Sequence, residues 1–157
     1  STPAELRATL MAMRVMPDLS LVPLPENDTQ PYTKVSLATT DFIEVILVCW
    51  LPNKITAPHH HGQSFCVVKL LTGHLSNTLF DVNQQILIPR EQHTYKTNDI
   101  HYVPAGQIHA EGSLTHDLGY SLHLYVPPIQ NMRVYDLDTN QGHIVTKGAG
   151  AWTPNTQ

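Results

Sequence analysis

The sequence has few charged residues, no basic run and no long apolar segment. Only 14% of its 157 residues are charged, and the formal net charge at pH 7 is -4, which argues against nucleic acid as a partner. No apolar span approaches the roughly 20 residues that a membrane helix requires, and no secretory signal opens the chain. We therefore expect a soluble, cytoplasmic protein with neither a membrane nor a nucleic-acid partner.

Cysteine is also scarce, since Cys49 and Cys66 are the two in the chain. A single disulfide would be unusual in a secreted scaffold of this length, so we expect reduced thiols in a reducing compartment. Cys49 lies in the apolar run Val45 to Trp50 and is expected to be a core residue. Cys66 is different because it closely follows a run of three histidines.

The length and the 12 prolines favour one compact, turn-rich domain over residues 1–157. A capping box at Thr2-Pro3-Ala4-Glu5 predicts a short amphipathic helix within residues 1–20, packed on the outside of a sheet. Short strands separated by turns over residues 32–136 predict an all-β sandwich or barrel. The small and polar residues 148–157 predict a partly disordered tail.

The strongest strand patterns are at Phe42 to Trp50 and at Gly119 to Val126. A shorter strand at Ile86 to Ile88 is expected to stop at Pro89, and a separate, weaker strand is expected at His93 to Lys96. Ligands of barrels built from such strands lie inside them, so the residues that face the interior are the candidates for function.

Histidine spacing predicts a metal centre. In an extended strand the side chains of His59 and His61 lie on one face while His60 points away. Pro104-x-Gly106 marks a turn that is followed at once by His109, which we take as the third ligand. Imidazole suits zinc, copper, iron and nickel, so the spacing by itself does not name the metal.

A second pattern alternates polar and apolar residues along one strand. Ser121, His123 and Tyr125 share one face of the segment Ser121 to Val126. An ordinary half-buried strand with a wet polar face shows the same alternation. If the strand lines a barrel instead, the three side chains form a row that points into the pocket and must be hydrogen bonded, since an unpaired buried polar group costs roughly 1–3 kcal/mol.

Together these motifs resemble the thiol dioxygenases of the cysteine dioxygenase family, over about Tyr32 to Asp136. Each motif taken alone is of weak to moderate specificity, but their combination in this order is specific. The resemblance is carried by His59-x-His61, Pro104-x-Gly106-x-x-His109, Cys66 five residues after the second ligand, and Ser121-x-His123-x-Tyr125 ahead of Pro127-Pro128.

The resemblance implies a cupin, a jelly-roll-like β-barrel, that holds mononuclear Fe(II) on His59, His61 and His109. The carboxylate ligand common in cupins is missing, and Cys66 stands near its place. Three neutral ligands leave the ferrous charge uncancelled, which favours an anionic thiolate as the incoming ligand. The implied reaction adds both atoms of O2 to a small thiol, with L-cysteine giving cysteine sulfinic acid as the first expectation.

The family also implies roles for the residues of the polar row. Tyr125 would lie near the iron and the substrate, with its hydroxyl steering bound oxygen or the substrate carboxylate. His123 would hold that hydroxyl, and Ser121 would hold the imidazole. Cys66 matches the position that forms a thioether with this tyrosine in part of the family, so a Cys66–Tyr125 cross-link is expected to be possible here.

One departure concerns the substrate. Tyr32-Thr33-Lys34 aligns with a segment where cysteine-oxidising members place an arginine that clamps the substrate carboxylate. Lys34 offers a point charge without the planar fork of arginine, so the exchange is not conservative. We expect Tyr32 and Lys34 to bind substrate, and 3-mercaptopropionate is the nearest alternative to cysteine.

Two other classes of function stay open. One is a cupin that binds metal without catalysis, and the other is a different metallocupin enzyme, such as an isomerase. We expect a monomer or weak oligomer. The remaining histidines, at positions 60, 74, 93, 101, 116 and 143, are expected to be surface or structural residues without matching partners, and Trp50 and Trp152 to be packing residues.

Overall fold

A computed structural model describes residues 1–26, 29–146 and 150–151 of the chain. Its helices are α1 (Pro3–Ala12) and the short 3-10 helix η1 (Leu19–Leu21). Its strands are β1 (Tyr32–Thr39), β2 (Glu44–Trp50), β3 (His59–His60), β4 (Phe65–Thr72), β5 (His74–Asn83), β6 (Ile86–Lys96), β7 (Ile100–Val103), β8 (Ile108–Ser113), β9 (Gly119–Val126), β10 (Asn131–Tyr135) and β11 (Gly142–Thr146).

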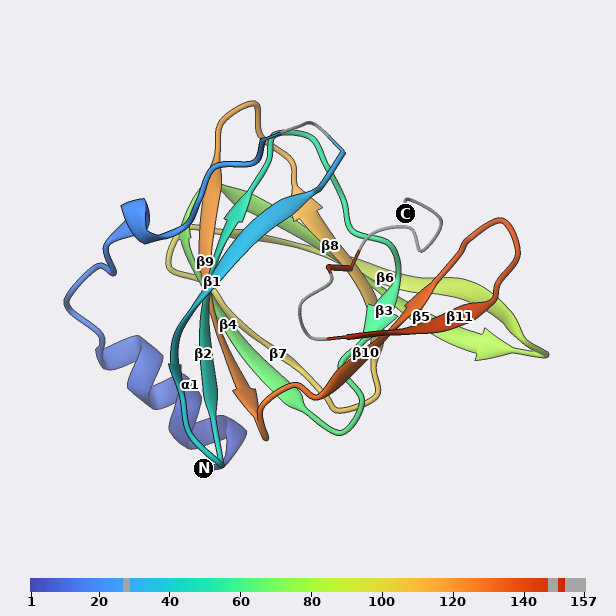
Figure 1. Cartoon of the computed structure of the whole chain (residues 1–157), viewed down its shortest axis with the longest axis horizontal. Coiled ribbons are helices and arrows are strands. Elements are labelled where there is room, and N and C mark those ends of the chain that lie inside the picture. The colour runs from blue at the N-terminus through green and yellow to red at the C-terminus, as the bar shows by residue number, and fades with distance from the viewer. Residues whose placement is uncertain (27–28, 147–149, 152–157) are drawn as a thin grey trace.

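The strands form two antiparallel sheets that face each other across a barrel (Figure 1). The five-stranded sheet has the order β1-β2-β9-β4-β7, and the six-stranded sheet has the order β11-β10-β3-β8-β5-β6. The predicted all-β barrel with a short N-terminal helix is therefore confirmed. Within the described part of the chain, no helix has the length and apolar character needed to cross a membrane.

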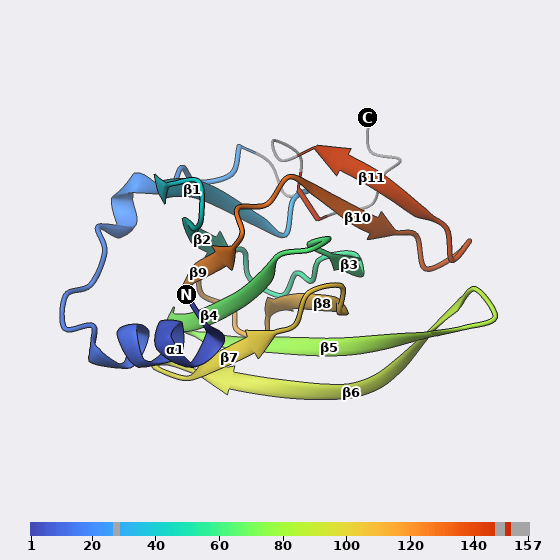
Figure 2. The same cartoon turned by 90° about the horizontal axis from the view of Figure 1, so that it is seen from below.

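Helix α1 covers the outer face of the five-stranded sheet, beside β4 and β7 (Figure 2). Thr2 and Glu5 form the predicted capping box, and Pro3 occupies the first turn. Leu6 and Leu10 are buried against the outward-facing apolar side chains of the sheet, which accounts for the helical spacing in the sequence. Buried Lys69 of β4 donates a hydrogen bond of 2.9 Å to the carbonyl of Leu10 and so satisfies a carbonyl of the last turn.

The prediction that a strand stops at Pro89 is wrong. Strand β6 continues through this proline to Lys96, at the edge of its sheet, where the missing N–H breaks no ladder to a further strand. The register also shifts there, because Phe80 of β5 pairs with Pro89 whereas Leu79 pairs with Glu91, so Arg90 is the extra residue of a β-bulge. The proline is accommodated by its position at an edge and beside a bulge.

Other strand boundaries differ more modestly from expectation. Strand β2 begins two residues later than Phe42, because the backbone N–H groups of Phe42 and Ile43 bond to the hydroxyl of Thr40 in a turn. Strand β9 has the bounds that the sequence predicts, whereas β8 and β11 were not predicted. The predicted tail lies outside the described residues, apart from Gly150 and Ala151.

Alternation along β2 separates the two sides of the five-stranded sheet. Cys49 faces outward into the cluster under α1 and is fully buried, so its predicted role as a core residue is confirmed. Ile46, Val48 and Trp50 face inward and pack in the cluster between the sheets. Both cysteines are free thiols, as expected. The inward-facing side chains of this sheet therefore form one wall of the barrel interior, where the site residues are expected.

Replacing Leu10 by alanine tests the docking of α1. Leu10 is 2% exposed, so we expect Leu10→Ala to lower the free energy of unfolding by about 2–5 kcal/mol. Met11, on the same helix, is 58% exposed, and Met11→Ala should change it by less than about 0.5 kcal/mol. Urea titration measures both; equal effects of the two variants would contradict this packing.

Candidate metal centre

His59, His61 and His109 come together inside the barrel as the sequence predicts. Strand β3 pairs with β8 so that His59 and His109 lie directly opposite each other. His61 follows in a turn closed by a hydrogen bond from the N–H of Ser64 to its carbonyl, with Gly62 at φ +62°. The three side chains are buried, and one nitrogen from each lies within 4.8 Å of the others.

Two of the three imidazoles are held by their Nδ1 atoms. His59 Nδ1 lies 2.8 Å from the carbonyl oxygen of Ala57, and His109 Nδ1 lies 2.8 Å from the side-chain oxygen of Asn77. Because a carbonyl oxygen only accepts, each Nδ1 carries the hydrogen and each Nε2 keeps a lone pair. Among the described residues, none is a hydrogen-bond partner of the buried His109 Nε2, as expected for an atom that faces a ligand site.

Burial also keeps these imidazoles neutral. It lowers the pKa of His59 to about 4, and burial together with neighbouring histidines holds the pKa of His61 and of His109 well below 6.5. A neutral imidazole is the form that binds a metal ion. The three side chains therefore fit a metal ion in position and protonation state, and His59 and His109 also fit it in orientation. His60 lies outside this set, and its Nδ1 accepts a hydrogen bond from the N–H of Gly62.

A small pocket, with a cavity volume of about 30 Å³, lies beside the histidines. Its wall combines apolar side chains with most of the residues that the sequence singled out. The lining residues are Tyr32, Lys34, Ile46, Val48, Trp50, Thr56, His59, His61, Glu111, His123, Tyr125, Ile129 and Met132.

The alternating residues of β9 form the inward-facing row rather than a wet face. Ser121 Oγ lies 2.8 Å from His123 Nε2, and His123 Nδ1 lies 3.1 Å from the hydroxyl oxygen of Tyr125. Trp50 adds a fourth member that the sequence reading treated as a packing residue only: its indole N–H donates to Ser121 Oγ at 2.7 Å.

Trp50 fixes the direction of the first bond of this row, because an indole nitrogen can only donate. Ser121 accepts from Trp50 and can pass its own hydrogen to His123 Nε2. Burial lowers the pKa of His123 to about 4, so its neutral ring then carries one hydrogen, on Nδ1, and donates it to Tyr125. The hydroxyl hydrogen of Tyr125 is left to point away from His123, and burial keeps the pKa of this hydroxyl well above 10.

Cys66 lies directly opposite Tyr125 in the pairing of β4 with β9. Its thiol contacts the hydroxyl of Tyr125 and lies 3.8 Å from His123 Nδ1. Burial raises the pKa of this thiol well above its ordinary value of 9.0, so the group is protonated at neutral pH. Cys66 and Tyr125 are therefore neighbours, as the sequence predicts.

Tyr32 and Lys34 lie two residues apart on β1, and both line the pocket. Tyr32 is buried, which raises its pKa to about 12, and its hydroxyl accepts a hydrogen bond of 3.0 Å from the N–H of Ala151. Lys34 is partly buried opposite Val48 of β2. Lys34 therefore lines the same pocket as His59 and His61.

Two buried residues near the centre were not identified from the sequence. His101 of β7 was expected to have no partner, but its Nε2 lies 3.0 Å from a carboxylate oxygen of Glu111 on β8. Burial by itself would raise the pKa of Glu111, but the interaction with His101 outweighs it and lowers this pKa. Glu111 follows His109 by two residues in a strand, a spacing that places both on one face and could have indicated it.

Comparison with known proteins points to one family. A family model described as cysteine dioxygenase type I matches residues 22–138. Cysteine dioxygenase type 1 of Danio rerio is 33% identical over 115 residues, which cover 69% of this chain and 56% of that protein. The protein of the same name from Rattus norvegicus is 30% identical over 107 residues, covering 65% and 54%. The chain thus spans about half the length of these relatives.

Solved structures show the fold. A protein with a double-stranded β-helix domain from Klebsiella pneumoniae has a TM-score of 0.60 at 15% identity, covering 78% of this chain and 92% of that one. A cupin superfamily protein from Desulfitobacterium hafniense has a TM-score of 0.55 at 20% identity, covering 73% and 91%. The barrel is therefore a cupin. Because the family model matches most of its length, the chain belongs to the cysteine dioxygenase type I family.

Proposed function

We propose that the protein is an Fe(II)-dependent thiol dioxygenase that adds both atoms of O2 to a small thiol. L-cysteine, converted to cysteine sulfinic acid, is the leading substrate. The observation that carries the proposal is the hydrogen-bonded row from Trp50 to Tyr125, which ends in the pocket that His59 and His61 of the three-histidine cluster line. A protein that only retained a metal ion would not need this row.

Ferrous iron bound by the three histidines would supply open coordination positions for thiolate and dioxygen and a redox-active centre between them, while the sulfur supplies the four electrons that reduce O2. The protein's residues would do the rest. Ile46, Val48 and Met132 line the pocket with apolar groups that exclude water. Tyr125 would present its hydroxyl hydrogen to the reacting groups, because His123 holds the oxygen of that hydroxyl from the other side.

Lys34 would bind the carboxylate of the substrate. A lysine ammonium can donate to a carboxylate but cannot match both of its oxygens in one plane. This favours an acidic thiol without fixing which one, so 3-mercaptopropionate, which shares the carboxylate and thiol of cysteine, is the alternative substrate.

Cys66 and Tyr125 would form a thioether. They lie opposite each other on neighbouring strands with the thiol in contact with the phenol hydroxyl. Formation of a bond between sulfur and a ring carbon removes one hydrogen from each residue, and dioxygen would take up the two electrons.

Oxygen uptake tests the proposed reaction. Protein loaded with Fe(II) under anaerobic conditions should consume oxygen when L-cysteine is added and should form the sulfinate, identified by mass spectrometry. His109→Ala should abolish uptake because it removes one of the three metal ligands. Protein that binds iron at this site but oxidises no member of a panel of small thiols would refute the proposal and favour the binding-protein alternative.

Intact-mass measurement tests the cross-link. Part of the protein, after turnover with thiol and oxygen, should have a mass lower by two hydrogens. Cys66→Ser should remove this species, whereas Cys49→Ser, which changes the cysteine on the outer face of the barrel, should retain it. A Cys66 peptide that is always recovered with a free thiol would exclude the thioether.

Substitution of Lys34 tests the proposed substrate contact. Lys34→Met should raise the KM for L-cysteine by about tenfold or more, the cost of losing one charge-assisted hydrogen bond. The exposed lysine Lys96 provides a control, and Lys96→Met should leave steady-state kinetics unchanged. An unaltered KM in Lys34→Met would show that this lysine does not bind the substrate.

A further inference from the structure

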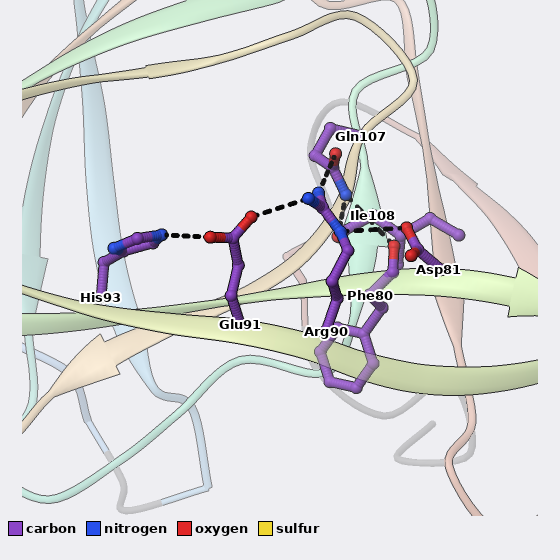
Figure 3. A network of polar contacts seen from close by, with 7 residues as sticks. All are labelled: Phe80, Asp81, Arg90, Glu91, His93, Gln107 and Ile108. Atoms are coloured by element: carbon purple, nitrogen blue, oxygen red, sulfur yellow. Dashed lines mark hydrogen bonds and ion pairs between the residues drawn. The ribbon is translucent and has the colours of Figure 1, made fainter.

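The described part of the chain contains two glutamate–histidine pairs of equal length in very different surroundings. Glu91 and His93 are 3.0 Å apart on the exposed edge strand β6, in a network with Arg90 (Figure 3). Glu111 and His101 are also 3.0 Å apart, but each side chain is only 3% exposed. An exposed pair costs little to form, whereas a buried pair must offset the loss of hydration. The buried pair therefore calls for a physical reason.

The carboxylate of the buried pair lies on the pocket side. Glu111 lines the pocket together with His59 and Lys34. Its partner His101 is absent from the pocket wall, and the ring of Tyr95 stacks on it with centroids 4.1 Å apart. Glu111 thus contacts the imidazole of His101 on the side away from the pocket, and the ring of Tyr95 packs against that imidazole.

The backbone ties Glu111 to the metal cluster. Its N–H donates to the hydroxyl oxygen of Thr56 at 3.0 Å, and the same oxygen lies 3.5 Å from His59 Nδ1. Glu111 is not among the residues whose ligand atoms lie within 4.8 Å of one another. Glu111 therefore lines the same pocket as His59 without being one of the ligands of the cluster.

The balance of charges in the pocket suggests a role for the Glu111 carboxylate. Three neutral imidazoles contribute no negative charge to a divalent ion, and Lys34 adds a further positive charge to the pocket. Among the described residues that line it, Glu111 is the acidic one. In a buried site such a charge acts over several ångströms with little screening.

We propose that Glu111, braced by His101, is an outer carboxylate of the metal centre, which supplies the negative charge that the three-histidine ligand set lacks and so tightens divalent metal binding. The proposal rests on the metal centre of the proposed function and does not depend on thiol oxidation. Glu111 would thus be a fourth protein group of the centre, beside the three histidines. Its carboxylate would act on the metal ion through its charge and not through a coordinate bond.

Fe(II) affinity, measured anaerobically by competition with a chromogenic chelator, tests this role. Glu111→Gln removes the charge and keeps the shape, and we expect it to weaken Fe(II) binding about 10- to 100-fold, as the loss of outer-shell partners does in other metal sites. Glu91→Gln removes a carboxylate from the exposed pair and should leave the affinity unchanged. An equal effect of the two variants, or no effect of Glu111→Gln, would overturn the proposal.

A double variant separates the field of the carboxylate from support of the fold. Replacing a buried polar pair by apolar side chains of similar volume is often neutral for stability, so Glu111→Leu with His101→Leu should keep the melting temperature of the metal-free protein. The same variant should lose the same Fe(II) affinity as Glu111→Gln. If it binds Fe(II) as tightly as the parent, or if neither variant folds, the pair serves the fold and the proposal is wrong.

These outcomes are independent of the proposed reaction. A parent protein that binds Fe(II) but oxidises no thiol would refute the proposed function and leave the affinity comparison intact. A parent that oxidises cysteine while Glu111→Gln binds Fe(II) normally would refute only the role of Glu111.

Discussion

Three neutral imidazoles buried against one another are the constraint on which the rest of the site depends. Such a cluster can bind a metal ion only if each ring keeps a lone pair on the nitrogen that faces the others, and therefore its hydrogen on the nitrogen that faces away. The carbonyl of Ala57 and the amide of Asn77 provide this for His59 and His109. The pairing of β3 with β8 sets the distance between these two rings. Fold and site are thus linked through one short strand.

The same logic governs the opposite wall. Strand β9 places three polar side chains inside an apolar barrel, and they are satisfied by one another in a fixed order that starts from the donor of Trp50. Because His123 bonds to the oxygen of Tyr125, the row can orient the hydroxyl hydrogen of Tyr125 toward the pocket. Polar groups without hydrogen bonds to one another would not fix this orientation. Tyr125 and the histidines His59 and His61 therefore face one pocket from opposite sides. This arrangement is consistent with a reaction that takes place in the pocket between them.

Much of this site could be predicted because its residues follow local rules. Period-two alternation identifies His59 and His61, and likewise the row on β9, while a Pro-x-Gly turn marks His109. Contacts between distant strands carry no such signal, so Asn77, Trp50 and the pair of His101 with Glu111 were identified only from the structure. Pro89 shows the opposite error: a local rule for strand ends was overridden by its place at a sheet edge beside a bulge.

The charges around the pocket bear on the substrate of the proposed reaction. In that proposal, Lys34 would provide a cation for an acidic substrate, and neutral metal ligands would favour a thiolate. Isotope labelling tests the central claim most directly: in 18O2, cysteine sulfinate formed by the iron-loaded protein should carry two heavy oxygen atoms. A product with one heavy oxygen or none, or iron-loaded protein that forms no product from any thiol, would contradict the assignment of this centre as a thiol dioxygenase.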